Sequence, residues 1–238
     1  MRFSGKQMVV TGAASGLGLA IARAAEAEGA IIIALDREAA PFAGSHVCDV
    51  SDEEQVKTAL SGLSRVDAVV NSAGIALRVD VADTDMADYD RVMAVNLRGT
   101  FLVSKYALPA MRTPKLDGNG GAILHFSSCV TAGIRNRAAY SASKGAIISL
   151  TRSMALDYAA EKIRVNCLCP GFVETPLLAK LPPERKARIA ASHPLGRLGQ
   201  PEDIVPMALL LLSDQGAWIT GQAIGVDGGF NAGHHEDI

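Results

Sequence analysis

Short apolar runs alternate with helix-forming segments along almost the whole chain. Most of these runs are continuously apolar, which is typical of strands covered on both faces of a sheet. We expect strands at residues 7–11, 31–35, 45–48, 67–70, 122–126, 164–169 and 223–226. Strands that alternate with helices predict an α/β fold, a doubly wound parallel sheet of about seven strands with helices on both faces.

Helical periodicity and capping residues predict helices between these strands. The expected helices cover 17–28, 86–111 and 138–160, and others begin at Ser51 and Pro201. Ser51 and Glu54 match a capping box, and proline suits the first helical position. Only eight residues, 37–44, join the second and third strands, which predicts a loop or a single turn. Prolines interrupt residues 174–198, which we expect to form a mobile lid over the carboxyl edge of the sheet.

The chain is long enough for a sizeable core, and its charges nearly balance. Of 238 residues, 49% are hydrophobic and 20% charged, and 23 basic against 25 acidic side chains give a formal charge of -2. We therefore expect one domain over residues 1–238 and no nucleic-acid partner. Because neither a membrane span nor an export signal is evident, we expect a cytoplasmic protein without a membrane partner. No metal site is predicted, because metal-ligand spacing is absent among Cys48, Cys129, Cys167 and Cys169 and the histidines.

A glycine-rich turn joins the first strand to the first helix. The turn reads Thr11-Gly12-Ala13-Ala14-Ser15-Gly16-Leu17-Gly18. Glycines in this setting let the backbone approach a pyrophosphate, and the helix amino terminus offers free N–H groups to it. A tight turn without a ligand is the alternative. The pattern predicts a Rossmann-type dinucleotide site whose contacts are Gly12, Ser15, Gly16, Leu17 and Gly18.

The second strand ends in an acidic residue. Asp36 follows Gly18 by 18 residues, about where a carboxylate binds the ribose hydroxyls of an adenosine. Its charge would repel a 2′-phosphate, so we expect NAD rather than NADP. The neighbouring Arg37 also belongs to the expected cofactor site and argues the other way, since arginine can accept a 2′-phosphate.

The third and fourth strands also end in residues suited to a ligand. Asp49 and Val50 close the third strand, and the carboxylate either accepts from an adenine amino group or serves as a loop acid. The fourth strand ends in Asn71-Ser72-Ala73-Gly74, whose small residues let a cofactor pass close to the backbone. We expect Asn71, Ala73 and Gly74 to contact the cofactor.

Tyr140 and Lys144 lie four residues apart on an expected helix and therefore share one face. A cation beside a phenol favours the phenolate, so Lys144 is expected to lower the pKa of Tyr140 from its usual value of about 10. A chance pair on a surface helix is the alternative. Asn96 lies in the middle of another expected helix, where asparagine is unfavourable, so it has either a functional reason or an exposed position.

Taken together, the motifs resemble the short-chain dehydrogenase/reductase family over nearly the whole chain. Thr11-Gly12-x3-Gly16-x-Gly18 is similar to the cofactor motif of the family, and Tyr140-x3-Lys144 is similar to its active site. Asn71-Ser72-Ala73-Gly74 is similar to the NNAG motif of the family, with Ser in place of the second Asn. The family pattern also covers Asn96, Ser128, Pro170-Gly171 and Asp227-Gly228-Gly229. The resemblance implies an oxidoreductase with a nicotinamide cofactor, commonly a homotetramer.

The resemblance also implies a role for each matching residue. Tyr140 would be the general base in alcohol oxidation and the acid in ketone reduction. Lys144 would lower the pKa of Tyr140 and bind the nicotinamide ribose, and Asn96 would hold a water that links Lys144 to solvent. Ser128 would hydrogen-bond the substrate oxygen. Further cofactor contacts would come from Pro170, Gly171, Val173 and Thr175.

Two residue assignments have alternatives. Counting from the fifth strand selects Ser128 as the catalytic serine, whereas counting back from Tyr140 by the commonest family spacing selects Ser127; the alternation of side chains along a strand favours Ser128. Arg135 and Arg137 lie between serine and tyrosine. Arg137 is expected either to clamp a substrate carboxylate or to belong to a solvated loop.

Three functions fit this sequence. The first is an NAD-dependent dehydrogenase of a small polar secondary alcohol, such as a polyol, a sugar or a hydroxy acid. The second is a 3-oxoacyl thioester reductase, which predicts NADPH use and is disfavoured by Asp36. The third, a non-catalytic nucleotide sensor, would be expected to lack Tyr140 or Lys144, and both are present.

Overall fold

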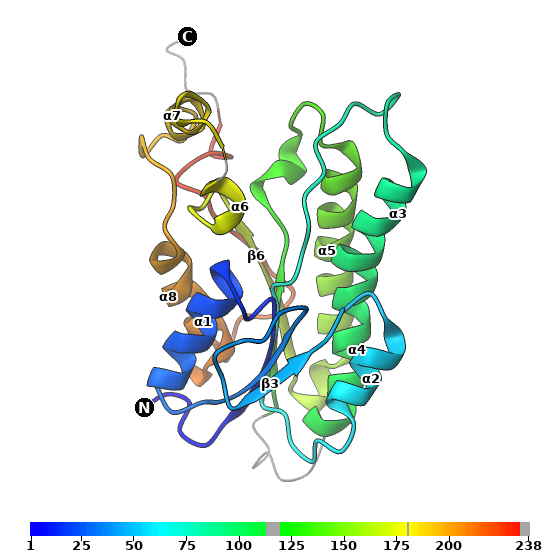
Figure 1. Ribbon diagram of the computed structural model, residues 1–238. Coiled ribbons are helices and arrows are strands. Elements are labelled where there is room, and N and C mark those ends of the chain that lie inside the picture. Colours follow the sequence, from blue (N-terminus) through cyan, green and yellow to red (C-terminus); the bar gives the residue numbers. More distant parts are fainter. Residues whose placement is uncertain (113–119, 180, 234–238) are drawn as a thin grey trace.

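A computed structural model describes residues 1–112, 120–179 and 181–233, and they form three layers with one sheet in the middle (Figure 1). The sheet is wholly parallel, with the strand order β3-β2-β1-β4-β5-β6-β7. The strands are β1 (Gln7–Thr11), β2 (Ile31–Asp36), β3 (Gly44–Val47), β4 (Ala68–Asn71), β5 (Ala122–Phe126), β6 (Arg164–Pro170) and β7 (Ala223–Val226). The predicted Rossmann-type α/β fold is confirmed.

Helices cover both faces of this sheet (Figure 1). One face carries α1 (Gly16–Ala27) and α8 (Pro201–Leu212), and the other carries α2 (Glu53–Leu60), α4 (Gly99–Met111) and α5 (Ala138–Asp157). The remaining helices are α3 (Met86–Met93), α6 (Pro176–Ala179), α7 (Pro183–Ala191), a π-helix at Ala94–Arg98 and short 3-10 turns at Cys129–Ala132, Ala159–Glu161 and Asp214–Gly216. In the described ranges, no helix has the length and apolarity needed to cross a membrane.

The strand order reverses at β1, which places a crevice at the carboxyl edge of the sheet. Thr11, the last residue of β1, pairs with Leu35 on one side and with Asn71 on the other. In open α/β sheets ligands bind outside the strand ends at such a reversal. The two halves of the sequence therefore meet where a dinucleotide would bind.

The crossover between β2 and β3 contains no helix, as its length predicts. Its side chains nevertheless contribute to the core, because Ala40 and Phe42 are buried against the face that carries α1 and α8. The predicted cap of α2 is wrong by one residue. Asp52 caps this helix by accepting from the N–H groups of Glu54 and Gln55, while the hydroxyl of Ser51 donates to Asp49 at 2.7 Å.

The segment 174–198 leaves the sheet and returns to the same place. Val173 and Gly199 form an isolated parallel bridge, in which the N–H of Glu174 donates to the carbonyl of Gly199 at 2.8 Å. Between these two points lie α6 and α7. Pro176 begins α6 rather than breaking a helix, because proline fits the first helical turn.

Candidate active site

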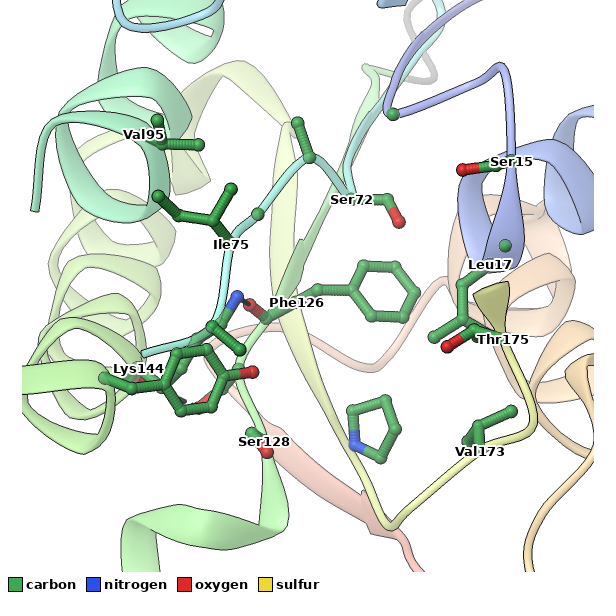
Figure 2. Close-up of a pocket in the computed structure, with 18 of the residues that line it drawn as sticks. Ser15, Leu17, Ser72, Ile75, Val95, Phe126, Ser128, Lys144, Val173 and Thr175 are labelled. Atoms are coloured by element: carbon green, nitrogen blue, oxygen red, sulfur yellow. Dashed lines mark hydrogen bonds between the residues drawn. The ribbon is translucent and has the colours of Figure 1, made fainter. Parts of the chain in front are cut away.

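One cavity of about 390 Å³ opens at the carboxyl edge of the sheet, beside the point where the strand order reverses (Figure 2). Residues that we expected to contact a cofactor supply much of its lining. They are Gly12, Ser15, Gly16, Leu17, Asp36, Arg37, Asp49, Val50, Ala73, Gly74, Tyr140, Lys144, Pro170, Gly171, Val173 and Thr175. Ser127, Ser128 and Arg137 line the same cavity.

The glycine-rich turn is shaped for close approach. Gly16 has a φ of 57°, which favours glycine, and a Cβ on Gly18 would lie 2.2 Å from the carbonyl oxygen of Gly12. Gly18 therefore packs the helix against the turn and does not itself line the cavity. No side chain caps the amino terminus of α1, whereas Asp52 caps α2 and Asp85 caps α3. The first N–H groups of α1 thus fit a pyrophosphate.

Asp36 braces this turn. Its carboxylate accepts from the N–H of Ala14 at 3.0 Å and from the N–H of Glu38 at 3.1 Å. A carboxylate has about four lone-pair positions, so acceptor capacity is left for ribose hydroxyls. Asp36 and Arg37 both line the cavity at this end.

Two other polar residues at strand ends are placed differently from each other. Asp49 lines the cavity, and its carboxylate accepts from both the N–H and the hydroxyl of Ser51. Asn71 does not line it. The Asn71 side chain is buried and donates to the Ser104 hydroxyl at 3.1 Å, and its Oδ1 has no hydrogen-bond partner among the described residues. The side chain of Asn71 therefore links β4 to α4 rather than facing a cofactor.

Asn96 is fully buried, so the alternative of an exposed position is excluded. It lies in the π-helix, and its amide donates to the carbonyl of Ile75 and to the hydroxyl of Ser143, both at 3.0 Å. Its Oδ1 accepts from the N–H of Ile75 at 2.8 Å. Both amide hydrogens are engaged by the protein, so this side chain fixes the cavity wall at Ile75, and no side-chain donor is left for the expected water.

Lys144 reaches from α5 to the end of β5. Its Nζ donates to the carbonyl of Phe126 at 2.7 Å and lies 5.8 Å from the centre of the Tyr140 ring. The side chain is buried, and burial lowers the pKa of Lys144 to about 8. An amine in this state is poised to gain or lose a proton near neutral pH.

Tyr140 and Ser128 face each other. Burial raises the pKa of Tyr140, while the hydrogen bond from Ser128 and the positive charge of Arg137 oppose the rise. The predicted lowering of this pKa by Lys144 is therefore wrong, because burial of the phenol outweighs the charges that act on it and the Lys144 ammonium bonds to Phe126. Ser127 turns the other way, and its hydroxyl donates to the carbonyl of Lys144 at 2.8 Å.

The two arginines of the neighbouring loop differ in position. Arg137 is half-buried, lines the cavity, and its guanidinium carbon lies 5.7 Å from the centre of the Tyr140 ring. Arg135 is exposed and does not line the cavity. Of the two, Arg137 alone is placed to meet a molecule bound at Tyr140.

Sequence reasoning missed several residues of the cavity wall. Phe126 supplies the carbonyl that receives Lys144, and Ile75 and Val95 form apolar wall on the side of α5 (Figure 2). For Phe126 a signal was available, since it is the last residue of a strand that leads to the two serines. Ile75 and Val95 gave no signal, because apolar residues next to strands and in helices are usually core.

Comparisons with known proteins agree with this geometry. Residues 12–231 match the family model described as Enoyl-(Acyl carrier protein) reductase. The chain is 41% identical to 2-(S)-hydroxypropyl-CoM dehydrogenase 3 of Xanthobacter autotrophicus, over 97% of this chain and 98% of that protein. It is 36% identical to the 3-oxoacyl-(acyl-carrier-protein) reductase of Thermotoga maritima, over 96% and 99% of the two chains.

Solved structures are similar over the same extent. Ligand-free aldohexose dehydrogenase of Thermoplasma acidophilum has a TM-score of 0.90 at 32% identity, covering 99% of this chain and 97% of that one. A protein of Beutenbergia cavernae, described as a putative NAD(P)-dependent gluconate 5-dehydrogenase with bound NADP, has a TM-score of 0.87 at 35% identity, covering 97% and 98%. Fold, cavity and comparisons together show that this chain is an oxidoreductase of the short-chain dehydrogenase/reductase family.

Proposed function

We propose that the protein transfers a hydride between a nicotinamide cofactor and a small polar secondary alcohol or its ketone. The observation that carries this proposal is the convergence of Tyr140, Ser128 and Lys144 on one end of a cavity whose other end holds the glycine turn and Asp36. The relative that acts on a hydroxypropyl group supports a secondary alcohol as the substrate class.

Each residue at the reacting end has a defined task in this proposal. Ser128 holds the substrate oxygen, and Tyr140 takes the hydroxyl proton during oxidation and returns it during reduction. The bound nicotinamide supplies the hydride acceptor or donor. Lys144, whose pKa burial lowers to about 8, holds the cofactor ribose beside Tyr140. The positive charge of Arg137 opposes the rise in the pKa of Tyr140, and the positive charge of an oxidised cofactor would add to this effect.

We infer that the cofactor is NAD. Asp36 keeps free acceptor positions for ribose hydroxyls, and a 2′-phosphate beside this carboxylate costs several kcal/mol. Arg37 at the same end would favour NADP, and one structural neighbour holds NADP. The ratio of kcat/KM for the two cofactors therefore tests the inference directly, with a preference for NAD expected and a preference for NADP contradicting it.

A panel assay tests the proposed reaction. Polyols, sugars and hydroxy acids are offered with NAD or NADP, and the reduced cofactor is followed by absorbance. At least one secondary alcohol is expected to be oxidised by the parent protein. Failure of every alcohol and of every corresponding ketone, with a protein that still binds NADH, would refute the proposed reaction and favour a nucleotide sensor.

Reduction of a 3-oxoacyl thioester is the second candidate. It is favoured by the relative of Thermotoga maritima, which is 36% identical over nearly both chains. It predicts NADPH-dependent turnover of an acetoacetyl thioester that exceeds the turnover of any small ketone in the panel. The opposite order of rates supports the small polar alcohol.

We also propose a homotetramer, a cytoplasmic location and a mobile lid. Large apolar side chains remain exposed on the outer helices, at Phe101 of α4 and at Leu156 of α5, which favours burial by other copies. Light scattering that gives a monomer would contradict the homotetramer.

The four cysteines are free, as expected in a reducing compartment such as the cytoplasm. The bridge between Val173 and Gly199 closes the base of the segment 174–198, so that α6 and α7 can move together as a lid.

A further inference from the structure

An arginine at the reacting end of the cavity belongs to an unbalanced group of positive charges. Arg137 is half-buried, with its guanidinium carbon 5.7 Å from the centre of the Tyr140 ring. The positive charges of Arg78 and Arg185 both act on it. The three arginines come from three separate elements, namely the segment after β4, the loop before α5, and α7.

The loop that carries Arg137 is tied to the segment that carries Arg78. The guanidinium of Arg137 donates to the carbonyl of Leu77 at 3.4 Å, and the N–H of Val79 donates to the carbonyl of Asn136 at 3.0 Å. Asn136 has a φ of 60°, a conformation that asparagine tolerates and that turns its carbonyl toward Val79. These bonds hold the segment of Arg78 beside the loop of Arg137.

The third charge comes from the segment 174–198. Arg185 is half-buried in the first turn of α7, which lies on the opposite side of the carboxyl edge from α5 (Figure 1). Burial first, and then the charges of Arg78 and Arg185, lower the pKa of Arg137. A half-buried guanidinium thus faces like charges from two other elements, an arrangement that disfavours its charged form.

No carboxylate balances this group in the described part of the chain. None of Arg78, Arg137 and Arg185 forms an ion pair there. Glu174, an acid at the base of the same segment, is already paired with Lys186 at 3.3 Å. The only opposing charge that acts on Arg137 is that of ionised Tyr140. An anionic ligand would relieve this repulsion, and neutral substrates would not.

We propose that Arg137, with the positive charges of Arg78 and Arg185 acting beside it, binds an anionic oxygen group, a carboxylate or a sulfonate, on the substrate whose hydroxyl group meets Tyr140. This inference rests on the proposed function and names its substrate class: short hydroxy acids rather than sugars or polyols. Guanidinium groups recognise both anions through paired N–H donors. Because Arg137 lies beside the Tyr140 ring, only a few bonds separate the anionic group from the reacting hydroxyl.

The position of Arg137 separates this site from the cofactor. Asp36 and Arg37 lie at the end of the cavity formed by the glycine turn, whereas Arg137 lies beside Tyr140. Figure 2 shows Ser15 and Leu17 on the opposite side of the cavity from Lys144 and Ser128. A 2′-phosphate of NADP belongs to the first of these two ends, so it is not the anion that the arginines bind.

The arginines are expected to differ in their effects. Arg137→Gln lowers kcat/KM for 3-hydroxybutanoate with NAD about 10- to 100-fold more than kcat/KM for the neutral 3-hydroxybutanamide, because it removes charged hydrogen bonds that only the acid makes. Arg185→Gln has the same selectivity with a smaller loss. Arg78→Gln, at an exposed residue, lowers the rate with the acid by up to about fivefold. Arg137→Lys restores part of the loss, since it keeps the charge without the planar fork.

Matched controls lie close by in the chain. Arg135→Gln removes an exposed charge two residues before Arg137, and Arg188→Gln removes an exposed charge from the same helix as Arg185. Both are expected to leave the ratio of rates for the acid and the amide unchanged. Equal losses for the acid and the amide in Arg137→Gln, or the same loss in Arg135→Gln, would overturn the proposal.

A binding measurement tests the anion site without turnover. Calorimetric titration of butanoate, propane-1-sulfonate and butanamide into the protein saturated with NADH is expected to detect binding of one or both anions to the parent and weak or no binding of the amide. Arg137→Gln weakens anion binding about 10- to 100-fold, and Arg135→Gln leaves it unchanged. Comparison of butanoate with propane-1-sulfonate shows whether the site prefers a planar carboxylate or a tetrahedral sulfonate. If the amide binds as tightly as both anions, the anion site is refuted. The proposed function still stands in that case when a neutral alcohol is oxidised, so the two failures can be told apart.

Discussion

The cavity has one buried wall and one loosely packed wall. On the side of β5 and α5, Lys144 in the wall and the polar side chains of His125 and Thr151 behind it are buried and hydrogen-bonded. On the other side, α6 has four residues, and α7 buries none of its side chains. Groups that perform chemistry must be held within a fraction of an ångström, whereas a segment that admits substrate must be able to move. The difference favours chemistry at the first wall and movement of the second.

Replacement of Lys144, in the buried wall, is expected to have the largest effect on activity. Lys144→Met is expected to lower kcat/KM at least about 100-fold, because it removes the charge beside Tyr140 and the bond to Phe126. Thermal unfolding is expected to stay cooperative, since the lost amine was held in a site where burial disfavours its charge. Arg152→Met, at an exposed residue of the same helix, is the control and should leave kcat/KM unchanged. Retention of most of the activity by Lys144→Met would contradict the role of Lys144.

His125, behind the buried wall, makes the stability of the protein depend on pH. Burial chiefly, and the charge of Lys144, lower the pKa of His125 from 6.5 to about 3. The unfolded chain therefore binds more protons below pH 6.5, and stability is lost as the pH falls from 6.5 towards 3. The loss is about 2 kcal/mol between pH 6.5 and pH 5.

Chemical unfolding at several pH values measures this dependence. His125→Asn is expected to remove the about 2 kcal/mol difference between pH 6.5 and pH 5, whatever it costs at pH 7. His46→Asn changes an exposed histidine and should keep the parent slope. A parent protein equally stable at pH 6.5 and pH 5 would show that His125 is not held neutral.

Substitutions in the loosely packed wall are expected to change the stability of the protein least. Glu174 and Lys186 form a half-exposed ion pair between the base of the segment 174–198 and α7. Glu174→Gln is expected to change the free energy of unfolding by less than about 1 kcal/mol. A double-mutant cycle with Lys186→Gln isolates the pair, and a coupling of several kcal/mol would mean that this wall is as rigid as the other.

Much of the fold followed from the sequence because its signals are local. The bounds of β1, β5 and β7 agree with the prediction, since each is a short apolar run closed by turn residues. The cap of α2 could not be decided locally, because Asp52-x-x-Gln55 competes with Ser51-x-x-Glu54. The hydrogen bond from Ser51 to Asp49 leaves Asp52 as the cap.

The site was predictable only in part. Tyr140, Lys144 and the glycine turn are motifs of fixed spacing, so the sequence places them together. The burial of Asn96 depends on a π-helix that the periodicity of residues 86–111 does not reveal. The group of Arg78, Arg137 and Arg185 arises from three elements far apart in the sequence, and no spacing rule brings them together.

The central claim is that Tyr140 transfers the proton of the reacting hydroxyl. The most direct test compares Tyr140→Phe with the parent protein, using the best alcohol from the panel and measuring kcat/KM together with the Kd of NADH. The variant is expected to lose at least about 100-fold in kcat/KM while still binding NADH. A variant that oxidises the alcohol as fast as the parent would contradict the account.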